Sequence, residues 1–554
     1  MKSFFAKTAL IALSALLLAA AQPIAFPLIT ESENLIFDTP WQSLLAWFGM
    51  IPALMAFYPL RGGKRFLAAF VFAVFYFSLC LYWINIAVIV YGQIHPLASA
   101  GISLLLSILM AAFWGTGLYW GFALSQKFNI RLSITLPFSF VSTELLRNYA
   151  FSGYPWSNLA YTQHLNLPFL QTASLWGVYG MTFILVMTNA LAFELLLWQK
   201  DKRLEAFPRI PLLIWSALTA FSFAFGLNHL RSMETAEAEA PRVKAALIQG
   251  NIDQKTKNET AVHANNILRV YSELSRQIPS DVELVIWPEA AYPYSVPNEW
   301  PSMRSSFEEY LPNPLPWRIL TGVVTHRRVN SERLFHNSAF LVEKDFSISG
   351  RFAKSHLVPF GEYVPLRDIL KVEKIVPGAG MFVPGELGEG LHYDDRRFGA
   401  LICYEGIFPE ISREYANKDV QFLVNLTNDA WYGVSSAPYQ HLSFYAFRAA
   451  ENGKALLRAA NTGFSAIIDG TGRVRERTPL FTRTALVGEI PLHSEKTLYT
   501  IIGDAPAWIC FIAWLFGVGL FIFFHKNQAK SGQTDLHLSA HQKIIPRSRH
   551  RNHR

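Results

Sequence analysis

The stretch Ala400-Leu401-Ile402-Cys403-Tyr404-Glu405-Gly406 joins two different sequence patterns. Phe398 to Ile402 is an apolar run typical of a strand, whereas Glu405 to Tyr415 has the charged and apolar spacing of a helix. Cys403 is therefore predicted at a strand-to-helix junction, where free N–H groups and the positive helix end can lower a thiol pKa and stabilise an oxyanion. A lone cysteine is more often a small buried core residue, so its role depends on what accompanies it.

Two other strand-like stretches end in a titratable side chain. The apolar run Val282 to Trp287 is followed by Pro288 and Glu289, and a weaker strand pattern from Phe346 ends at Lys354. The C-terminal ends of strands form the edge where open α/β sheets carry their chemistry, so we expect Glu289, Lys354 and Cys403 to lie together. A thiolate is a nucleophile, a carboxylate can take and return a proton, and an ammonium group stabilises developing negative charge. This ordered set resembles the Glu-Lys-Cys arrangement of the nitrilase, or carbon-nitrogen hydrolase, superfamily.

The composition indicates a membrane protein. The 554 residues are 51% hydrophobic and only 16% charged, which is too apolar for an ordinary soluble protein. Several charge-poor runs approach the roughly 20 residues needed to cross a bilayer. Eight spans are predicted, the fifth of which is short and contains Pro137, Glu144 and Arg147: 5–24, 41–60, 66–91, 98–124, 132–147, 169–198, 210–229 and 506–524.

Charges in the short loops predict the orientation of these spans. Lys and Arg residues fall in alternate loops, whereas Glu31, Glu33 and Asp38 lie in an opposite one. Eight spans then place both termini in the cytoplasm and export the large segment between the last two spans. The basic loop residues are Lys2, Lys7, Arg61, Lys64, Arg65, Lys127, Arg131, Lys200, Lys202, Arg203 and Arg209.

The first span has two interpretations. Lys2 and Lys7 ahead of an apolar stretch that ends in Ala19-Ala20-Ala21-Gln22 are typical of a secretory signal peptide. The apolar character continues from Pro23 to Ile29, which favours a retained helix. Both interpretations send the following loop across the membrane.

The basic character of the chain lies mainly in its C-terminal tail. Residues 525–554 hold seven Lys or Arg and one Asp, which is +6 of the formal net charge of +8. We therefore expect a cytoplasmic tail rather than a nucleic-acid-binding protein. The predicted organisation is a membrane domain at 1–230, an exported α/β domain at 231–500, a final span at 501–525 and a disordered tail at 526–554.

Cysteine usage agrees with an exported thiol enzyme. Cys80 and Cys510 lie within predicted spans, which leaves Cys403 without a disulfide partner in the exported segment. The segment has strand-like runs at 243–249, 282–287, 318–324, 338–342, 398–402, 422–426, 465–468 and 486–490, with helical patterns at 259–277, 405–416 and 438–454. This alternation predicts an α/β sandwich. There is no CxxC pair, HExxH, P-loop or GxGxxG, so neither a metal nor another cofactor is expected.

The arrangement of spans and motifs resembles a bacterial family of membrane-bound nitrilase relatives, the apolipoprotein N-acyltransferases. The resemblance covers about residues 40–525 and rests on the order of its landmarks rather than on any one of them. These are Phe151 to Trp156, Gln249 to Ile252, Trp287 to Glu289, Lys354 to Pro365, Ile402 to Glu405, Asn428 to Gly433, and Asn461 to Gly463. The fold implied is a helical membrane domain of about eight spans with an exported nitrilase-like αββα sandwich. The implied location is the bacterial inner membrane, with the catalytic domain on the periplasmic side.

The resemblance also implies roles for individual residues. Glu289 is expected to be the base, Lys354 the charge stabiliser and Cys403 the nucleophile. Glu362 is expected close to the lysine, and Tyr404 and Glu405 are expected to complete the pocket. Tyr154 and Trp156 are candidates for substrate contact, although aromatic residues near span ends are more often ordinary interface residues. Family members often carry a Trp where this chain has Asn258.

The implied reaction moves an acyl chain from a membrane phospholipid, through a Cys403 thioester, to the N-terminal amine of a diacylglyceryl-cysteine lipoprotein. A membrane-tethered amidase or nitrilase-type hydrolase is the first alternative, with water in place of the amine. A transporter or scaffold is the second, and it is disfavoured because the predicted spans carry few interior charges.

Overall fold

The computed structural model describes residues 2–27, 34–200, 206–258, 260–330, 332–365 and 382–541. Helices dominate the first 239 residues and return after residue 497. They are α1 (Lys2–Ala21), α2 (Ser43–Phe48), α3 (Ile51–Phe57), α4 (Gly62–Cys80), α5 (Ile84–Ile86), α6 (Pro96–Phe128), α7 (Leu132–Tyr149), α8 (Leu167–Leu170), α9 (Ala173–Lys200), α10 (Arg209–Glu239), α17 (Leu498–Ile502) and α18 (Ala505–His541). A short antiparallel ribbon of β1 (Ile24–Pro27) and β2 (Asn34–Phe37) follows α1.

Six helices in the described part of the chain are long and apolar enough to cross a membrane. They are Phe4–Ala21, Gly62–Cys80, Pro96–Phe128, Ala173–Lys200, Arg209–Glu239 and Ala505–Asn527. They coincide with six of the eight predicted spans. The membrane-spanning class is therefore confirmed, whereas the count of eight is matched only roughly.

The predicted span at 41–60 is wrong as one continuous helix. It is divided between α2 and α3, which meet at Gly49 and Met50. Ser14 donates a hydrogen bond to the Gly49 carbonyl at 2.7 Å, and the Met50 N–H donates to Asn189 Oδ1 at 2.8 Å. Side chains of α1 and α9 thus satisfy the backbone groups that the break exposes.

The predicted span at 132–147 is a helix, α7, but it is too polar to belong to the six. It contacts α6, α9 and α18, so its surroundings are protein. The Glu144 carboxylate is buried and accepts hydrogen bonds from the Leu159 N–H at 3.0 Å and the Thr182 hydroxyl at 2.9 Å. A helix enclosed by partners can carry such groups, which a lipid-facing helix cannot.

The segment between α10 and α17 forms two sheets. The first has the order β15-β3-β4-β6-β7-β8, with β5 also paired to β6, and the second has the order β14-β13-β12-β11-β10-β9. The strands are β3 (Arg242–Gln249), β4 (Leu284–Ile286), β5 (Tyr292–Pro297), β6 (Arg318–Val329), β7 (Glu332–Val342), β8 (Ile348–Ala353), β9 (Leu391–Tyr393), β10 (Arg396–Ile402), β11 (Phe422–Thr427), β12 (Ala455–Ala460), β13 (Ala466–Ile468), β14 (Val474–Arg477) and β15 (Thr484–Pro491).

The two sheets pack face to face with helices outside them. β12 contacts β3, and β10 contacts β7, across the interior. Along β3, Val243, Ala245 and Leu247 join the core between the sheets, whereas Ala246 and Ile248 join a second core beneath α12. This alternation is the period of two that a strand imposes on its side chains. The predicted αββα sandwich is confirmed.

The helices of the sandwich cover its two outer faces. α12 contacts β3, β5 and β15 of the first sheet, while α15 contacts β10 and α16 contacts β12 and β13 of the second. The bounds are α11 (Gln254–Asn258), α12 (Thr260–Arg276), α13 (Arg304–Phe307), α15 (Pro409–Asn417) and α16 (Ala437–Asn452), with short turns at η4 (Cys403–Ile407) and η5 (Asp429–Tyr432). Every predicted strand run overlaps one of the strands, although the run 282–287 is longer than β4 and the run 465–468 begins one residue before β13. The three predicted helices correspond to α12, α15 and α16.

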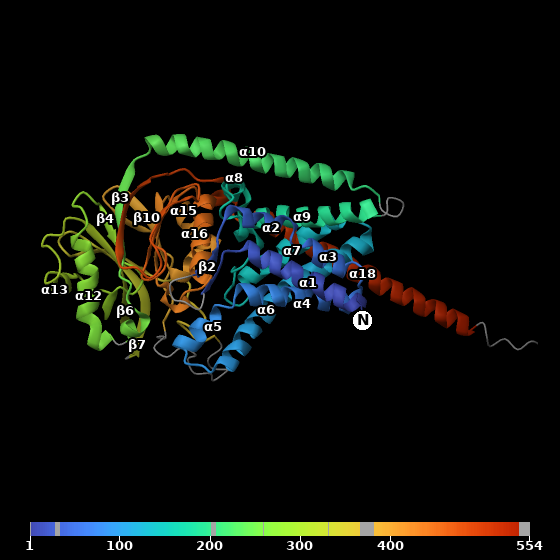
Figure 1. Ribbon diagram of the computed structural model, residues 1–554, viewed down its shortest axis with the longest axis horizontal. Coiled ribbons are helices and arrows are strands. Elements are labelled where there is room, and N and C mark those ends of the chain that lie inside the picture. The colour runs from blue at the N-terminus through green and yellow to red at the C-terminus, as the bar shows by residue number, and fades with distance from the viewer. Residues whose placement is uncertain are drawn as a thin grey trace, which may run out of the picture.

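Figure 1 shows the sandwich at one end of the molecule and the helical bundle at the other. α10 runs along the outside of the bundle and leads into β3 (Figure 1). The N-terminal end of α1 and the C-terminal part of α18 both lie at the bundle end, away from the sheets (Figure 1).

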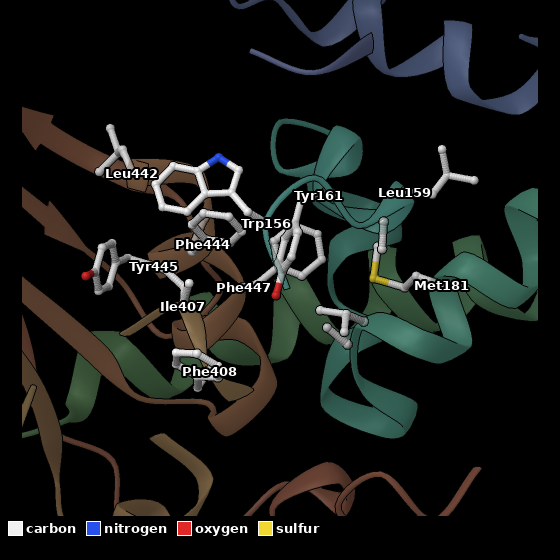
Figure 2. Packing of buried hydrophobic residues seen from close by; sticks show 14 of the residues in the cluster. Trp156, Leu159, Tyr161, Met181, Ile407, Phe408, Leu442, Phe444, Tyr445 and Phe447 are labelled. Carbon is white, nitrogen blue, oxygen red and sulfur yellow. The ribbon is translucent and has the colours of Figure 1, made fainter. Parts of the chain in front are cut away.

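The bundle and the sandwich share an aromatic interface. Trp156 and Tyr161 follow α7, and Phe444 and Phe447 lie on α16; Figure 2 shows the four side chains together. The ring centroids are 5.0 Å apart for Trp156 and Phe444, and 4.4 Å apart for Tyr161 and Phe444. Edge-to-face contacts of this kind add about 0.5–1.5 kcal/mol each beyond burial of their area. These ring contacts therefore attach α16 to the helical bundle.

Two elements extend beyond their predicted limits. α10 continues to Glu239, so the expected boundary at 230 falls within a helix. α18 continues to His541, so the expected disordered tail is helical over 526–541, and residues 542–554 lie outside the described residues. Once a helix has formed, each further residue adds a hydrogen bond without a new nucleation cost, and this favours continuation past the span.

Candidate active site

Each predicted catalytic residue follows the C-terminal end of a strand. Glu289 follows β4, Lys354 follows β8 and Cys403 follows β10. The turn after β4 lies close against β6, where a Cβ on Gly322 would come within 2.5 Å of the Pro288 carbonyl oxygen. Only glycine allows this approach, which fixes the position of the Glu289 backbone beside the sheet.

Lys354 lies between two carboxylates. Its Nζ is 2.8 Å from Glu362 Oε2 and 3.9 Å from Glu289 Oε1. The Lys354 residue is only 1% exposed. The Val358 N–H donates to the same Glu362 oxygen at 2.8 Å, which holds the loop after β8 around the lysine. The predicted proximity of Glu362 to the lysine thus agrees with the geometry.

Asn337 is a site residue that the sequence reasoning missed. Its Nδ2 donates hydrogen bonds to Glu289 Oε1 and to Glu362 Oε1, both at 2.8 Å. One amide group thus bridges the two carboxylates and keeps both near Lys354. The signal available in the sequence was that a polar residue, Asn337, comes directly before the strand-like run 338–342.

Burial and neighbouring charges both shift the pKa values of Lys354 and Glu289. Burial lowers the pKa of Lys354, but Glu362 and then Glu289 outweigh it, and the pKa lies above the usual value for lysine. Burial, together with the charge of Glu362, raises the pKa of Glu289 although Lys354 opposes the shift. Lys354 is therefore a permanent cation, and Glu289 is a stronger base than a solvated carboxylate.

Cys403 occupies a strained turn rather than the start of an α-helix. Its φ is 50°, and η4 (Cys403–Ile407) separates β10 from α15, which begins at Pro409. A left-handed conformation costs a non-glycine residue about 1–2 kcal/mol. Burial and the charge of Glu289 raise the thiol pKa, whereas Lys354 opposes that rise. The predicted lowering of the pKa by a helix end is therefore wrong for the resting protein, because the α-helix begins six residues later.

Glu405 is a buried clamp between two of the strand ends. Its Oε1 accepts hydrogen bonds from the N–H and the hydroxyl of Ser355, both at 2.7 Å, and its Oε2 accepts one from the Ile402 N–H at 2.7 Å. Ser355 follows Lys354 and Ile402 precedes Cys403. The carboxylate thus ties the lysine loop to the cysteine turn.

We expect Glu405→Gln to destabilise the protein by about 1–3 kcal/mol, because its amide nitrogen cannot accept and one buried donor loses its partner. The exposed Glu414→Gln on α15 is the matched control, with an expected effect within about 0.5 kcal/mol. Thermal unfolding in detergent measures both. Equal stability of the two variants would contradict the assignment of Glu405 as a clamp.

The remaining predicted residues lie on the side facing the membrane half. The Tyr404 hydroxyl donates to the Gly153 carbonyl at 3.3 Å, and its ring contacts His356 and Phe408. Tyr154 stacks on Trp156 with centroids 6.4 Å apart. Trp156 is 1% exposed and donates from Nε1 to Gln440 Oε1 at 2.7 Å, so protein atoms cover both its ring and its N–H.

Residues 254–258 form α11 beside the site. Lys257 Nζ donates to the Glu289 carbonyl at 3.1 Å, and burial lowers the pKa of this lysine to about 8. Asn258, where the family often has Trp, ends this helix, and its side chain lies outside the described residues.

The fold and the site together define the class of this protein. A membrane-embedded bundle is joined to a sandwich that carries Glu, Lys and Cys at its strand ends, and this combination is that of the membrane-bound carbon-nitrogen hydrolase relatives. The carbon-nitrogen hydrolase family matches residues 244–498, and the apolipoprotein N-acyltransferase N-terminal domain matches residues 34–191. The apolipoprotein N-acyltransferase of Geobacter metallireducens is 38% identical over 86% of this chain and 90% of its own length. The corresponding protein of Haemophilus influenzae is 31% identical over 87% of this chain and 91% of its own length. The chain belongs to the apolipoprotein N-acyltransferase family.

Solved structures give a weaker likeness. A carbon-nitrogen hydrolase from Helicobacter pylori G27 is 19% identical and covers 49% of this chain and 95% of its own, with a TM-score of 0.34. The family assignment rests on the sequence relatives.

Proposed function

We propose that Cys403 of this acyltransferase carries an acyl chain as a thioester between a membrane phospholipid and a lipoprotein amine. Membership of the family makes the chain a bacterial membrane enzyme of lipoprotein N-acylation. Glu289 and Lys354 lie together at strand ends of the first sheet, and both charges act on the thiol of Cys403 at a strand end of the second sheet. This clustering is the observation on which the proposed mechanism rests.

In the first half-reaction, the sulfur of Cys403 attacks the carbonyl carbon of a phospholipid ester while Glu289 takes the thiol proton. Lys354 and the N–H of Tyr404 stabilise the negative oxygen of the tetrahedral intermediate. The C–O bond then breaks, the proton passes from Glu289 to the leaving alkoxide, and a lysophospholipid departs.

In the second half-reaction, the α-amine of a diacylglyceryl-cysteine attacks the thioester. Glu289 accepts a proton from the amine and returns it to the leaving sulfur, which leaves an amide and a free Cys403 thiol. One carboxylate moves a proton in both directions, which suits a base whose pKa burial has raised.

The placement of the site suits a lipid substrate. Tyr404 contacts Gly153 in the loop after α7, and the Tyr91 hydroxyl donates to the Ala430 carbonyl at 2.7 Å. Each buried CH₂ of an acyl chain is worth about 0.8 kcal/mol, so an ester is best attacked without removing its chain from the bilayer. A site at the boundary between the bundle and the sandwich can therefore reach lipid and lipoprotein substrates while their chains stay in the bilayer.

A hydrolase is the alternative, with water attacking the thioester. Incubation with labelled phospholipid and a diacylglyceryl peptide separates the two reactions. Amide-linked label on the peptide supports transfer, whereas free fatty acid as the sole labelled product would show hydrolysis.

We further propose that the sandwich is periplasmic and both termini are cytoplasmic, with residues 1–230, 231–500 and 501–525 as the membrane, catalytic and anchoring parts. The loop charges and the position of both helix ends away from the sheets support this orientation (Figure 1).

Reporter fusions test the orientation. Fusions after residues near 65, 128 and 203 are expected to read cytoplasmic, because Lys and Arg near span ends favour that side. Fusions within 240–490 are expected to read exported. An exported signal at 203 would contradict the topology.

A further inference from the structure

We propose that Tyr445 is a positioning residue that aims the Tyr404 N–H, the oxyanion donor of the proposed function, by holding the Cys403 carbonyl. The inference rests on the proposed function, because it gives the N–H of Tyr404 a catalytic task. It concerns a set of buried polar residues on η5, α16 and β12 that the two half-reactions do not otherwise use.

The hydroxyl of Tyr445 donates a hydrogen bond to the carbonyl oxygen of Cys403 at 2.8 Å. That carbonyl and the N–H of Tyr404 belong to one planar trans peptide group and point in opposite directions. Fixing the oxygen therefore fixes the direction of the N–H. A hydrogen bond to the oxygen also polarises the peptide, which strengthens the N–H as a donor.

The turn needs such a restraint because its conformation is unfavourable. Cys403 has a φ of 50°, which costs a residue with a side chain about 1–2 kcal/mol. The Tyr445 ring also packs against Gly406, where a Cβ would come within 2.1 Å of the ring. The ring and its hydroxyl thus support the turn at two points.

The phenol is itself held by a second layer. His441 Nε2 is 3.1 Å from the Tyr445 hydroxyl, and His441 Nδ1 is 2.9 Å from Asp429 Oδ1. Arg458 Nη2 also lies 3.1 Å from His441 Nδ1. Arg458 Nη2 donates to Asp429 Oδ2 at 2.8 Å. The four residues Tyr445, His441, Asp429 and Arg458 are all buried.

Helix α16 also connects these four residues to the helical bundle of the membrane half. Gln440 Oε1 accepts hydrogen bonds from Trp83 Nε1 at 3.1 Å and Trp156 Nε1 at 2.7 Å. Gln440 Nε2 donates to the carbonyls of Pro23 at 3.2 Å and Cys80 at 3.3 Å. Gln440 precedes His441 directly, so contacts with the bundle fix the part of α16 from which the Cys403 carbonyl is held.

The test compares two reactions of Cys403 in the full-length protein carrying Tyr445→Phe. Thioester formation with phospholipid needs an oxyanion donor, whereas alkylation by iodoacetamide displaces iodide and forms no oxyanion. We expect acylation to slow about tenfold or more, short of the 10²–10³ lost when a donor itself is removed. Alkylation of the Cys403 peptide, followed by mass spectrometry, is expected to stay within twofold of wild type.

Tyr439→Phe on the same helix is the matched control, since its ring packs on Phe464 instead. It is expected to change neither rate. His441→Gln, which removes the ring that orients the phenol, is expected to slow acylation in the same direction and spare alkylation. Unchanged acylation in Tyr445→Phe, or equal slowing of acylation and alkylation, would overturn the proposal. Failure of the proposed function is distinguishable, because wild-type protein would then form no thioester.

Discussion

Cys403→Ala is expected to reduce acyl transfer to the uncatalysed level, a loss on the order of 10⁴–10⁶, because the proposed thioester forms on the sulfur of Cys403. Cys403→Ser keeps the shape of the side chain but replaces the thiol with a much less acidic hydroxyl. It is expected to bind phospholipid and to acylate poorly. Single-turnover transfer from labelled phospholipid to a diacylglyceryl peptide measures all three proteins.

The other two cysteines provide matched controls. Cys80 is buried in α4 and Cys510 is buried in α18, and both lie in helices apolar enough to cross a membrane. Cys80→Ala and Cys510→Ala are expected to retain nearly full transfer. Normal turnover by Cys403→Ala would exclude the covalent mechanism.

Lys354→Met and Glu289→Gln are each expected to slow both half-reactions by about 10²–10³. Lys354 stabilises the oxyanion in each tetrahedral intermediate, and Glu289 moves a proton in each step. Separate single-turnover measurements of acylation and of aminolysis give the two rates. A variant that slowed only one of them would show that its residue has been given too broad a role.

The pH dependence separates the two roles. The charge of Glu289 contributes to the raised pKa of Cys403, so Glu289→Gln lowers that pKa and produces thiolate at a lower pH. Raising the pH from about 6 to 9.5 should therefore partly restore acylation in Glu289→Gln. Lys354→Met loses a cation that opposes the raised thiol pKa, and a higher pH cannot replace that charge at the oxyanion. Equal and full rescue of both variants would mean that the roles are wrongly assigned.

Local patterns were sufficient to predict the three strand ends of the site. Apolar runs identified β4 and β10, and Glu289 and Cys403 follow them directly. Asn337 could not be found in this way, because its importance comes from two carboxylates brought to it from positions 289 and 362. The chain from Asp429 through His441 to Tyr445 was missed for the same reason, since η5, α16 and the Cys403 turn meet only in the folded protein.

The predicted count of eight spans is matched only roughly by the six helices that are long and apolar enough to cross a membrane, for a physical reason. Hydropathy measures how apolar a segment is and does not report whether lipid or protein surrounds it. α7 is enclosed by other helices and can bury Glu144, and the segment 41–60 breaks where Asn189 of α9 binds the Met50 N–H. The helical start at Glu405 was misplaced because the pattern of charged and apolar residues cannot show the positive φ of Cys403 or the extended Phe408 before Pro409.

The whole mechanism depends on the transfer of an acyl chain from phospholipid to Cys403, and intact-protein mass spectrometry detects that step. Purified protein is exposed to a phospholipid of defined chains without an acceptor, and its mass is compared with that of Cys403→Ala. We expect wild-type protein to gain the mass of one acyl group at Cys403. This gain is expected to be absent from the variant and to disappear when a diacylglyceryl peptide is added. Wild-type protein that transfers acyl chains without ever carrying one, or a Cys403→Ala variant that gains the same mass, would contradict the mechanism.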